Sequence, residues 1–149
     1  MKPTLFSSIL ILGLALAACG PVTAAPEVNP PLSAPTAAPL GDSILVWQRS
    51  GGFAGFCDKV VVGPTFEATV YNCKGGMKVT FKLTETQSAQ LRGWLSAYRP
   101  VEFVQSDPPM AADGMYVSLQ LAGRGSRSAD DAAIRSMLDF ASSLLSSAP

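Results

Sequence analysis

Cysteine offers the most chemistry in this 149-residue chain, because histidine is absent. Without histidine there are no Ser–His or Cys–His catalytic pairs and no histidine-liganded metal sites. Neither a Ser–Lys pair nor a pair of carboxylates stands at a recognisable catalytic spacing. We therefore expect no catalytic residues, no bound metal and no cofactor. The chain is expected to be a binding protein and not an enzyme.

Cys19 follows an apolar run near the start of the chain. Residues 1–18 carry one early positive charge, Lys2, and end in small residues. Their apolar stretch of about fourteen residues is shorter than the about twenty that a membrane-spanning helix needs. This order is typical of a secretory signal peptide. The sequence Leu16-Ala17-Ala18-Cys19 resembles the bacterial lipobox, which implies cleavage before Cys19 and lipid on its sulfur. The expected location is extracytoplasmic, anchored to the lipid bilayer of a bacterial cell membrane. The alternative is an ordinary signal peptide with Cys19 incidental.

Cys57 and Cys73 remain as an even pair once Cys19 is assigned to lipid. Exported chains fold where disulfides persist, and two thiols without histidine cannot complete a four-ligand zinc site. A turn centred near Thr65 would place the two cysteines opposite each other across a hairpin. We predict a Cys57–Cys73 disulfide; the alternative is two buried free thiols.

The segment after Cys19 is rich in proline and alanine, with six prolines between positions 20 and 40. Such a segment cannot build a core and favours the extended polyproline conformation. We interpret it as a stalk; the alternative is a proline-rich docking peptide. The predicted organisation is a signal peptide at 1–18, the lipidated cysteine and linker at 19–41, and one folded domain at 42–149.

The folded domain opens with strand-like segments. Alternation of apolar and polar residues is clearest over residues 77–83. Further strands are predicted at residues 43–49, 59–62, 66–72, 101–104 and 115–121. A buried face and a solvated face on the same strand are typical of antiparallel sheets.

Two amphipathic helices are predicted. The first begins with a capping box between Thr84 and Gln87 and ends before Pro100. Gly93, inside it, is interpreted as allowing close packing. The second begins near Ser128, the predicted N-cap. Its apolar stripe comprises Ile134, Met137, Leu138, Ala141, Leu144 and Leu145. The strands and helices do not alternate regularly. The expected fold is therefore α+β: an antiparallel sheet packed by two helices on one face, in a single small domain.

A glycine-rich stretch with two phenylalanines is the most distinctive binding candidate. Its residues are Ser50, Gly51, Gly52, Phe53, Ala54, Gly55 and Phe56. Exposed aromatic side chains on such a connection would make a protein-binding tip, because aromatic residues dominate interface energetics. The alternative is a turn or bulge whose phenylalanines point into the core. The stretch neither enters a helix nor ends in Lys-Ser or Lys-Thr, so a phosphate loop is discounted.

Charge excludes one class of partner. The chain has eleven basic and eleven acidic residues and no basic stripe, so we expect no nucleic acid. Arg124 and Arg127, beside the predicted start of the second helix, could form an anion site. The alternative is a solvated turn.

The stretch Gln48-Arg49-Ser50-Gly51-Gly52-Phe53-Ala54-Gly55 resembles the start of the emfourin family, small bacterial inhibitors of protealysin and related thermolysin-like metallopeptidases. A looser similarity extends over residues 44–145, through a Leu-Thr-x-x-Gln helix start at Leu83 and an Ala-Asp-Gly loop at Ala112. The resemblance implies an α+β domain that inhibits a secreted metallopeptidase, with residues 50–55 as the contact loop. This chain departs from the family pattern in an added hairpin at residues 57–76, a shortened connection at 123–125 and the lipid anchor.

Two hypotheses follow. The first is a lipid-anchored, non-enzymatic protein-binding domain that inhibits a thermolysin-like metallopeptidase. The second is a surface or envelope lipoprotein with a structural or ligand-binding role and no inhibitory activity, its partner another envelope protein. Exposure of Phe53 and Phe56 favours the first hypothesis, and their burial favours the second.

Overall fold

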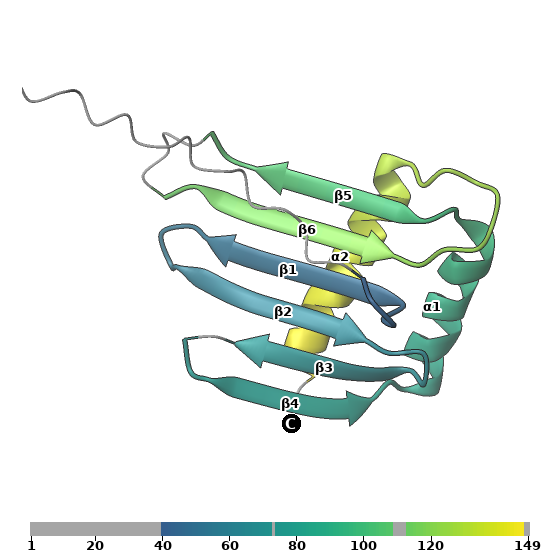
Figure 1. The fold of residues 1–149 in the computed structure, drawn as a ribbon, viewed down its shortest axis with the longest axis horizontal. Helices are drawn as coiled ribbons and strands as arrows, with labels where there is room; N and C mark the ends of the chain where they lie inside the picture. Colours follow the sequence, from purple (N-terminus) through teal and green to yellow (C-terminus); the bar gives the residue numbers. More distant parts are fainter. Residues whose placement is uncertain (1–39, 73, 109–112, 148–149) are drawn as a thin grey trace, which may run out of the picture. The chain divides into compact units, whose positions relative to one another are not determined.

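Six strands form one antiparallel sheet in the order β4-β3-β2-β1-β6-β5 (Figure 1). The structure is a computed structural model and describes residues 40–72, 74–108 and 113–147. The predicted signal peptide, Cys19, nearly all of the linker and Cys73 lie outside the described residues. The strands are β1 (Leu45–Gly51), β2 (Phe56–Val62), β3 (Glu67–Asn72), β4 (Met77–Lys82), β5 (Val101–Ser106) and β6 (Met115–Leu121).

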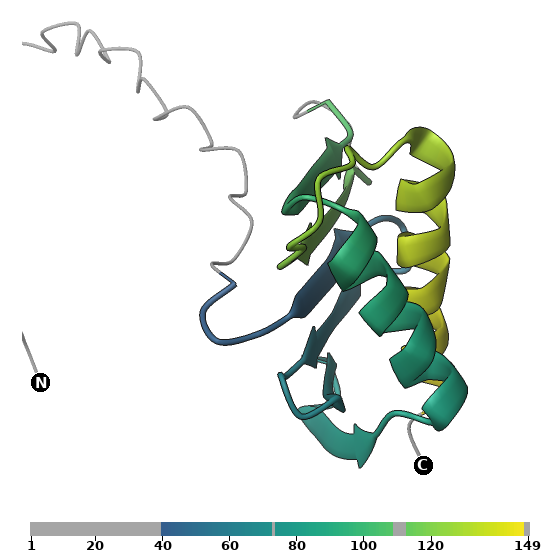
Figure 2. The ribbon, with the colours of Figure 1, turned by 90° about the vertical axis from the view of Figure 1, so that its right-hand side faces the viewer.

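Both helices cover the same face of the sheet, α1 (Glu85–Ala97) and α2 (Asp131–Ser146), as Figure 2 shows. The predicted α+β fold, an antiparallel sheet packed by two helices in a single small domain, is confirmed. Strands β2 and β5 are longer than predicted: β2 begins at Phe56 instead of Lys59, and β5 ends at Ser106 instead of Val104. Strand β1 has the predicted length but is shifted by two residues and ends at Gly51.

The core lies between the helices and the sheet. Alternate residues of each strand point toward the helices, as Leu45 and Trp47 do on β1, and the residues between them form the opposite face. The fully buried side chains include Val60, Val62, Val70, Leu91, Leu119, Leu121, Met137 and Leu144. We call the face away from the helices the open face.

The capping box of α1 is confirmed: the Gln87 backbone N–H donates to Thr84 Oγ1, and the Thr84 N–H donates to Gln87 Oε1. The interpretation of Gly93 is wrong, because a Cβ there would meet nothing within 4 Å. The predicted N-cap of α2 is also wrong. Asp130 caps the helix by accepting from the Ala133 N–H at 2.8 Å, two residues after Ser128.

The buried stripe of α2 differs by about one position from the expected one. Ala133, Met137, Phe140, Ala141 and Leu144 are buried, whereas the expected Ile134, Leu138 and Leu145 are only half-buried. Trp94 of α1 meets Phe140 edge-on, with ring centroids 5.3 Å apart. Phe140, which is absent from the expected stripe, is therefore buried in part by its contact with α1.

Three hairpin connections lie at one end of the sheet. Strand β1 ends at Gly51 beside Phe56 and Met115, and the register carries Asn72 and Ser106 to the same end. The chain enters the sheet at Leu45, the opposite end of β1. We call the end with the three connections the distal end.

Candidate protein-binding tip and the groove beside it

The glycine-rich stretch is the tip of the β1–β2 hairpin. Gly51 pairs with Phe56, which leaves residues 52–55 as the turn. Gly51, Gly52 and Gly55 have φ of +85°, +70° and +58°, a region that side chains other than glycine rarely adopt. Phe53 is 98% exposed, and among the described residues it is the most exposed large hydrophobic side chain.

The tip is held by its neighbours at the distal end. The Gly52 N–H donates to the Gly114 carbonyl at 3.1 Å, and the Gly55 N–H closes the turn on the Gly52 carbonyl at 2.7 Å. Lys74 Nζ donates to the Ala54 carbonyl. These contacts join the β1–β2 tip to both neighbouring connections, so Phe53 stands on a supported turn.

A polar network lies below the tip, on the helix-facing side of the sheet. Arg49 donates to Asp58 Oδ2 from Nη2 at 2.6 Å and from Nε at 3.2 Å, and Asn72 Nδ2 donates to Asp58 Oδ1 at 2.7 Å. The Arg49 guanidinium also lies over the Phe56 ring at 3.8 Å and near the Trp47 ring at 5.6 Å. Asp58 is 7% exposed, and both oxygens of its carboxylate accept hydrogen bonds from this network.

The structure therefore separates the two predicted phenylalanines. Phe53 is exposed, which favours the first hypothesis, and Phe56 is half-buried against Arg49. The expected pair of aromatic anchors is reduced to one. Of the remaining predicted residues, Ser50 and Gly51 belong to β1, while Gly52, Ala54 and Gly55 form the turn around Phe53.

Cys57 is the second residue of β2. The β2–β3 register pairs Asp58 with Asn72, so the hairpin is centred at Thr65, as predicted. One further step in that register leads from Cys57 to position 73. Cys73 lies outside the described residues, and the disulfide stays a prediction.

A groove of about 530 Å³ lies beside the tip on the sheet. Four of its side chains form a row across neighbouring strands of the open face, because Gln48 pairs with Lys59, Lys59 with Tyr71, and Tyr71 with Lys78. The register alone generates this row, and the sequence analysis missed it. Finding it requires the register of three hairpins, β1–β2, β2–β3 and β3–β4.

The predicted anion site near α2 is not assembled. Arg127 lies over the Tyr98 ring at 5.4 Å, and Ser128 accepts a hydrogen bond from Arg99 Nη2. The Asp130 carboxylate occupies the helix N-terminus, where it would repel an anion. Arg124 instead lines a separate pocket of about 500 Å³ with Phe66 and Arg92.

Within the described ranges, no group of three or more Cys, Asp or Glu side chains is placed to hold a metal ion. None of the helices in that part of the chain combines the length and apolarity needed to cross a membrane. Comparison of the chain with protein-family models, curated proteins and solved structures found no match.

Proposed function

We propose that this protein is a lipid-anchored, extracytoplasmic, non-enzymatic binding domain that engages a partner protein through its β1–β2 tip, with Phe53 as the anchor. The partner class we propose is a thermolysin-like metallopeptidase, which the protein inhibits. The partner class rests on the resemblance of the Ser-Gly-Gly-Phe-Ala-Gly stretch to the emfourin family.

The exposure of Phe53 is the observation that carries the proposal. Phe53 is 98% exposed, and a phenylalanine side chain buries about 150–250 Å² when it enters a pocket, so its burial by a partner would be favourable. Anchors of protein interfaces are typically large aromatic residues that fill a pocket on the partner. The tip contacts of Gly52 and Ala54 hold the turn before binding, which reduces the entropy lost on association.

The direction of β1 also supports this role. The chain enters at Leu45, and the tip lies at the far end of a seven-residue strand, about 20 Å away. The proposed anchor at Cys19 and its proline-rich linker precede that entry point. A tip at the end opposite the entry is suited to contact with a large partner away from the lipid surface.

The test is inhibition of several thermolysin-like metallopeptidases by the mature full-length protein in neutral detergent micelles. Replacing Phe53→Ala is expected to weaken inhibition at least about fivefold, which corresponds to the roughly 1 kcal/mol that marks an important interface contact. Val104→Ala is the matched control, because Val104 is 47% exposed on the edge strand β5 and lies away from the tip.

Three outcomes are informative. Inhibition that depends on Phe53 and not on Val104 supports the proposal. Inhibition unaffected by Phe53→Ala keeps the function and moves its site. No inhibition at micromolar protein across the panel leaves the second hypothesis, a surface or envelope lipoprotein with a structural or ligand-binding role, for which the open-face groove is the supporting observation.

The anchor has its own test. Cys19→Ser is expected to release the protein from the membrane fraction or to leave its precursor uncleaved, because the serine hydroxyl cannot receive the thioether-linked lipid. Unchanged processing and membrane partition would contradict lipidation. Since one acyl chain binds a membrane only marginally, stable anchoring implies more than one chain.

A further inference from the structure

The row Gln48–Lys59–Tyr71–Lys78 places two lysines on either side of one aromatic ring. Lys59 and Lys78 are two strands apart, a separation of about 10 Å, and Tyr71 lies between them on β3. Lys78 Nζ is 5.6 Å from the Tyr71 ring centre. Lys59 is half-buried, whereas Lys78 is exposed.

Among the described residues, no carboxylate forms an ion pair with Lys59 or Lys78. In the part of the chain that the structure describes, the ion pairs are Arg49–Asp58 and Arg92–Glu85, and neither includes a lysine. Asp58 also lines the groove, but its carboxylate is already hydrogen-bonded to Arg49 and Asn72. On the open face, Glu67 pairs across the strands with Lys82, at the other end of β3 and β4.

We propose that this row binds an acidic segment of the same partner protein that the tip engages. This inference rests on the proposed function and adds the partner's chemistry to it. The carboxylates of the segment pair with Lys59 and Lys78, and Tyr71 offers its ring to the segment's aliphatic stems. In a segment with polyproline II conformation, side chains three residues apart project to the same side and lie about 9 Å apart, which matches the spacing of the two lysines.

The groove lies close enough to the tip for one partner to reach both. Gln48 is four residues before Gly52, so the row is about 13 Å from the turn along β1. Lysine ammonium groups act as point charges and set no strict bonding geometry. The two lysines therefore favour a partner segment with closely spaced negative charges, whereas Phe53 requires a partner pocket that fits its ring.

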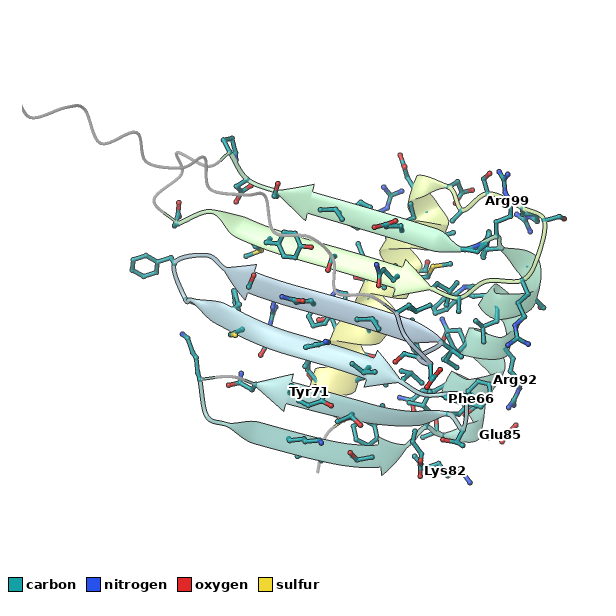
Figure 3. All side chains as sticks on the ribbon, viewed as in Figure 1. Phe66, Tyr71, Lys82, Glu85, Arg92 and Arg99 are labelled. Carbon is teal, nitrogen blue, oxygen red and sulfur yellow. The ribbon has the colours of Figure 1, made fainter. Side chains whose placement is uncertain are left out.

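The test measures binding of a fluorescein-labelled peptide of ten glutamates to the mature full-length protein in neutral detergent, by fluorescence anisotropy at low salt. The double variant Lys59→Gln/Lys78→Gln is expected to bind at least about fivefold more weakly. Lys82→Gln is the matched control; Lys82 is labelled in Figure 3. It lies on the same strand and face as Lys78 but pairs with Glu67. The Lys82→Gln variant is expected to change the affinity less than about twofold.

Two results would overturn the inference: equal weakening by Lys82→Gln and the double variant, or no peptide binding at low salt. Row-dependent binding of tripolyphosphate without binding of the peptide would also overturn it, because the ligand would then be a phosphate and not an acidic protein segment. Binding that weakens as salt rises is expected of paired exposed charges.

Phe53→Ala separates this inference from the proposed function. It should leave peptide binding unchanged while weakening peptidase inhibition. If no peptidase is inhibited but the peptide binds through Lys59 and Lys78, the groove stands and the proposed function fails. If inhibition depends on Phe53 and the double variant inhibits as well as the wild type, the function stands and the groove's role in it fails.

Discussion

Arg49 and Asp58 face each other across the first hairpin, and both hydrogen bonds of the guanidinium end on one carboxylate oxygen, at 2.6 and 3.2 Å. The side chain of Asp58 is 9% exposed and that of Arg49 25% exposed, so the pair is largely withdrawn from water. The pair joins the base of the tip to the β2–β3 hairpin, because Asn72 holds the other oxygen.

Arg49→Met is therefore expected to lower the free energy of unfolding by about 2–3 kcal/mol, because Asp58 keeps only Asn72 as a partner for a desolvated charge. Urea denaturation followed by circular dichroism measures this. The matched control is Glu85→Ala, which breaks the exposed Arg92–Glu85 pair and should cost less than about 1 kcal/mol. Equal losses in the two variants would show that the Arg49–Asp58 pair behaves as a surface pair.

Gly51→Ala is expected to destabilise the domain by more than about 2 kcal/mol. Its φ is +85°, and an added Cβ would lie 2.1 Å from the Gly114 carbonyl oxygen. The backbone segments around Gly51 and Gly114 would therefore have to separate. Gly76→Ala isolates the effect of conformation, because Gly76 has φ of +63° and nothing within 4 Å of the added Cβ. Gly76→Ala should lower the free energy of unfolding by about 1 kcal/mol. Thermal unfolding of both variants compares them, and a smaller loss for Gly51→Ala would contradict the close approach.

Phe66 is the one described residue other than glycine with a positive φ, +60°. Its ring packs against the core and under Arg92, at 5.1 Å, so the side chain holds an unfavourable backbone conformation in place (Figure 3). Phe66→Ala removes the ring and keeps the strain, whereas Phe66→Gly removes both. We expect the glycine variant to be more stable than the alanine variant by about 1 kcal/mol, because glycine adopts a positive φ without strain. Denaturant titrations of the two variants decide the order.

The Cys57–Cys73 disulfide is expected to contribute about 3 kcal/mol through a loop of about seventeen residues. Cys73→Ser should lower the unfolding free energy by that amount in non-reducing buffer. Wild-type and variant proteins should become similar in stability once the wild type is reduced. Two alkylatable thiols at positions 57 and 73 in the exported wild-type protein would show the prediction wrong.

Local patterns predicted most of the elements of this fold. The alternation over β3 and β4 and the capping box of Thr84 depend on neighbours in the sequence, and the structure contains them. The placement of β1 between β2 and β6 depends on pairing with a strand about seventy residues later. Nothing local to either strand specifies that pairing, so periodicity alone could not give the strand order.

The candidate site could be predicted only where it depends on residues that are close in the sequence. Phe53 was singled out because glycines surround it, and its exposure follows from the turn they make. The sequence leaves the exposure of Phe56 open, because the environment of Phe56 is set by Arg49, which faces it only once the hairpin register is known. The helix start was misjudged because Ser128 and Asp130 are both good N-caps, and the contact of Ser128 with Arg99 leaves Asp130 to cap the helix.

Gly123 and Gly125 set the distance between the β6–α2 connection and the end of α1. A Cβ on Gly123 would lie 2.3 Å from the Tyr98 carbonyl oxygen, and one on Gly125 would lie 2.2 Å from the Ala97 carbonyl carbon. The side-chain space that any other residue needs is already filled by backbone. Any side chain at either position would therefore push this connection away from α1. It would also lengthen the hydrogen bonds that the Arg124 and Gly125 N–H groups donate to the Leu95 and Tyr98 carbonyls.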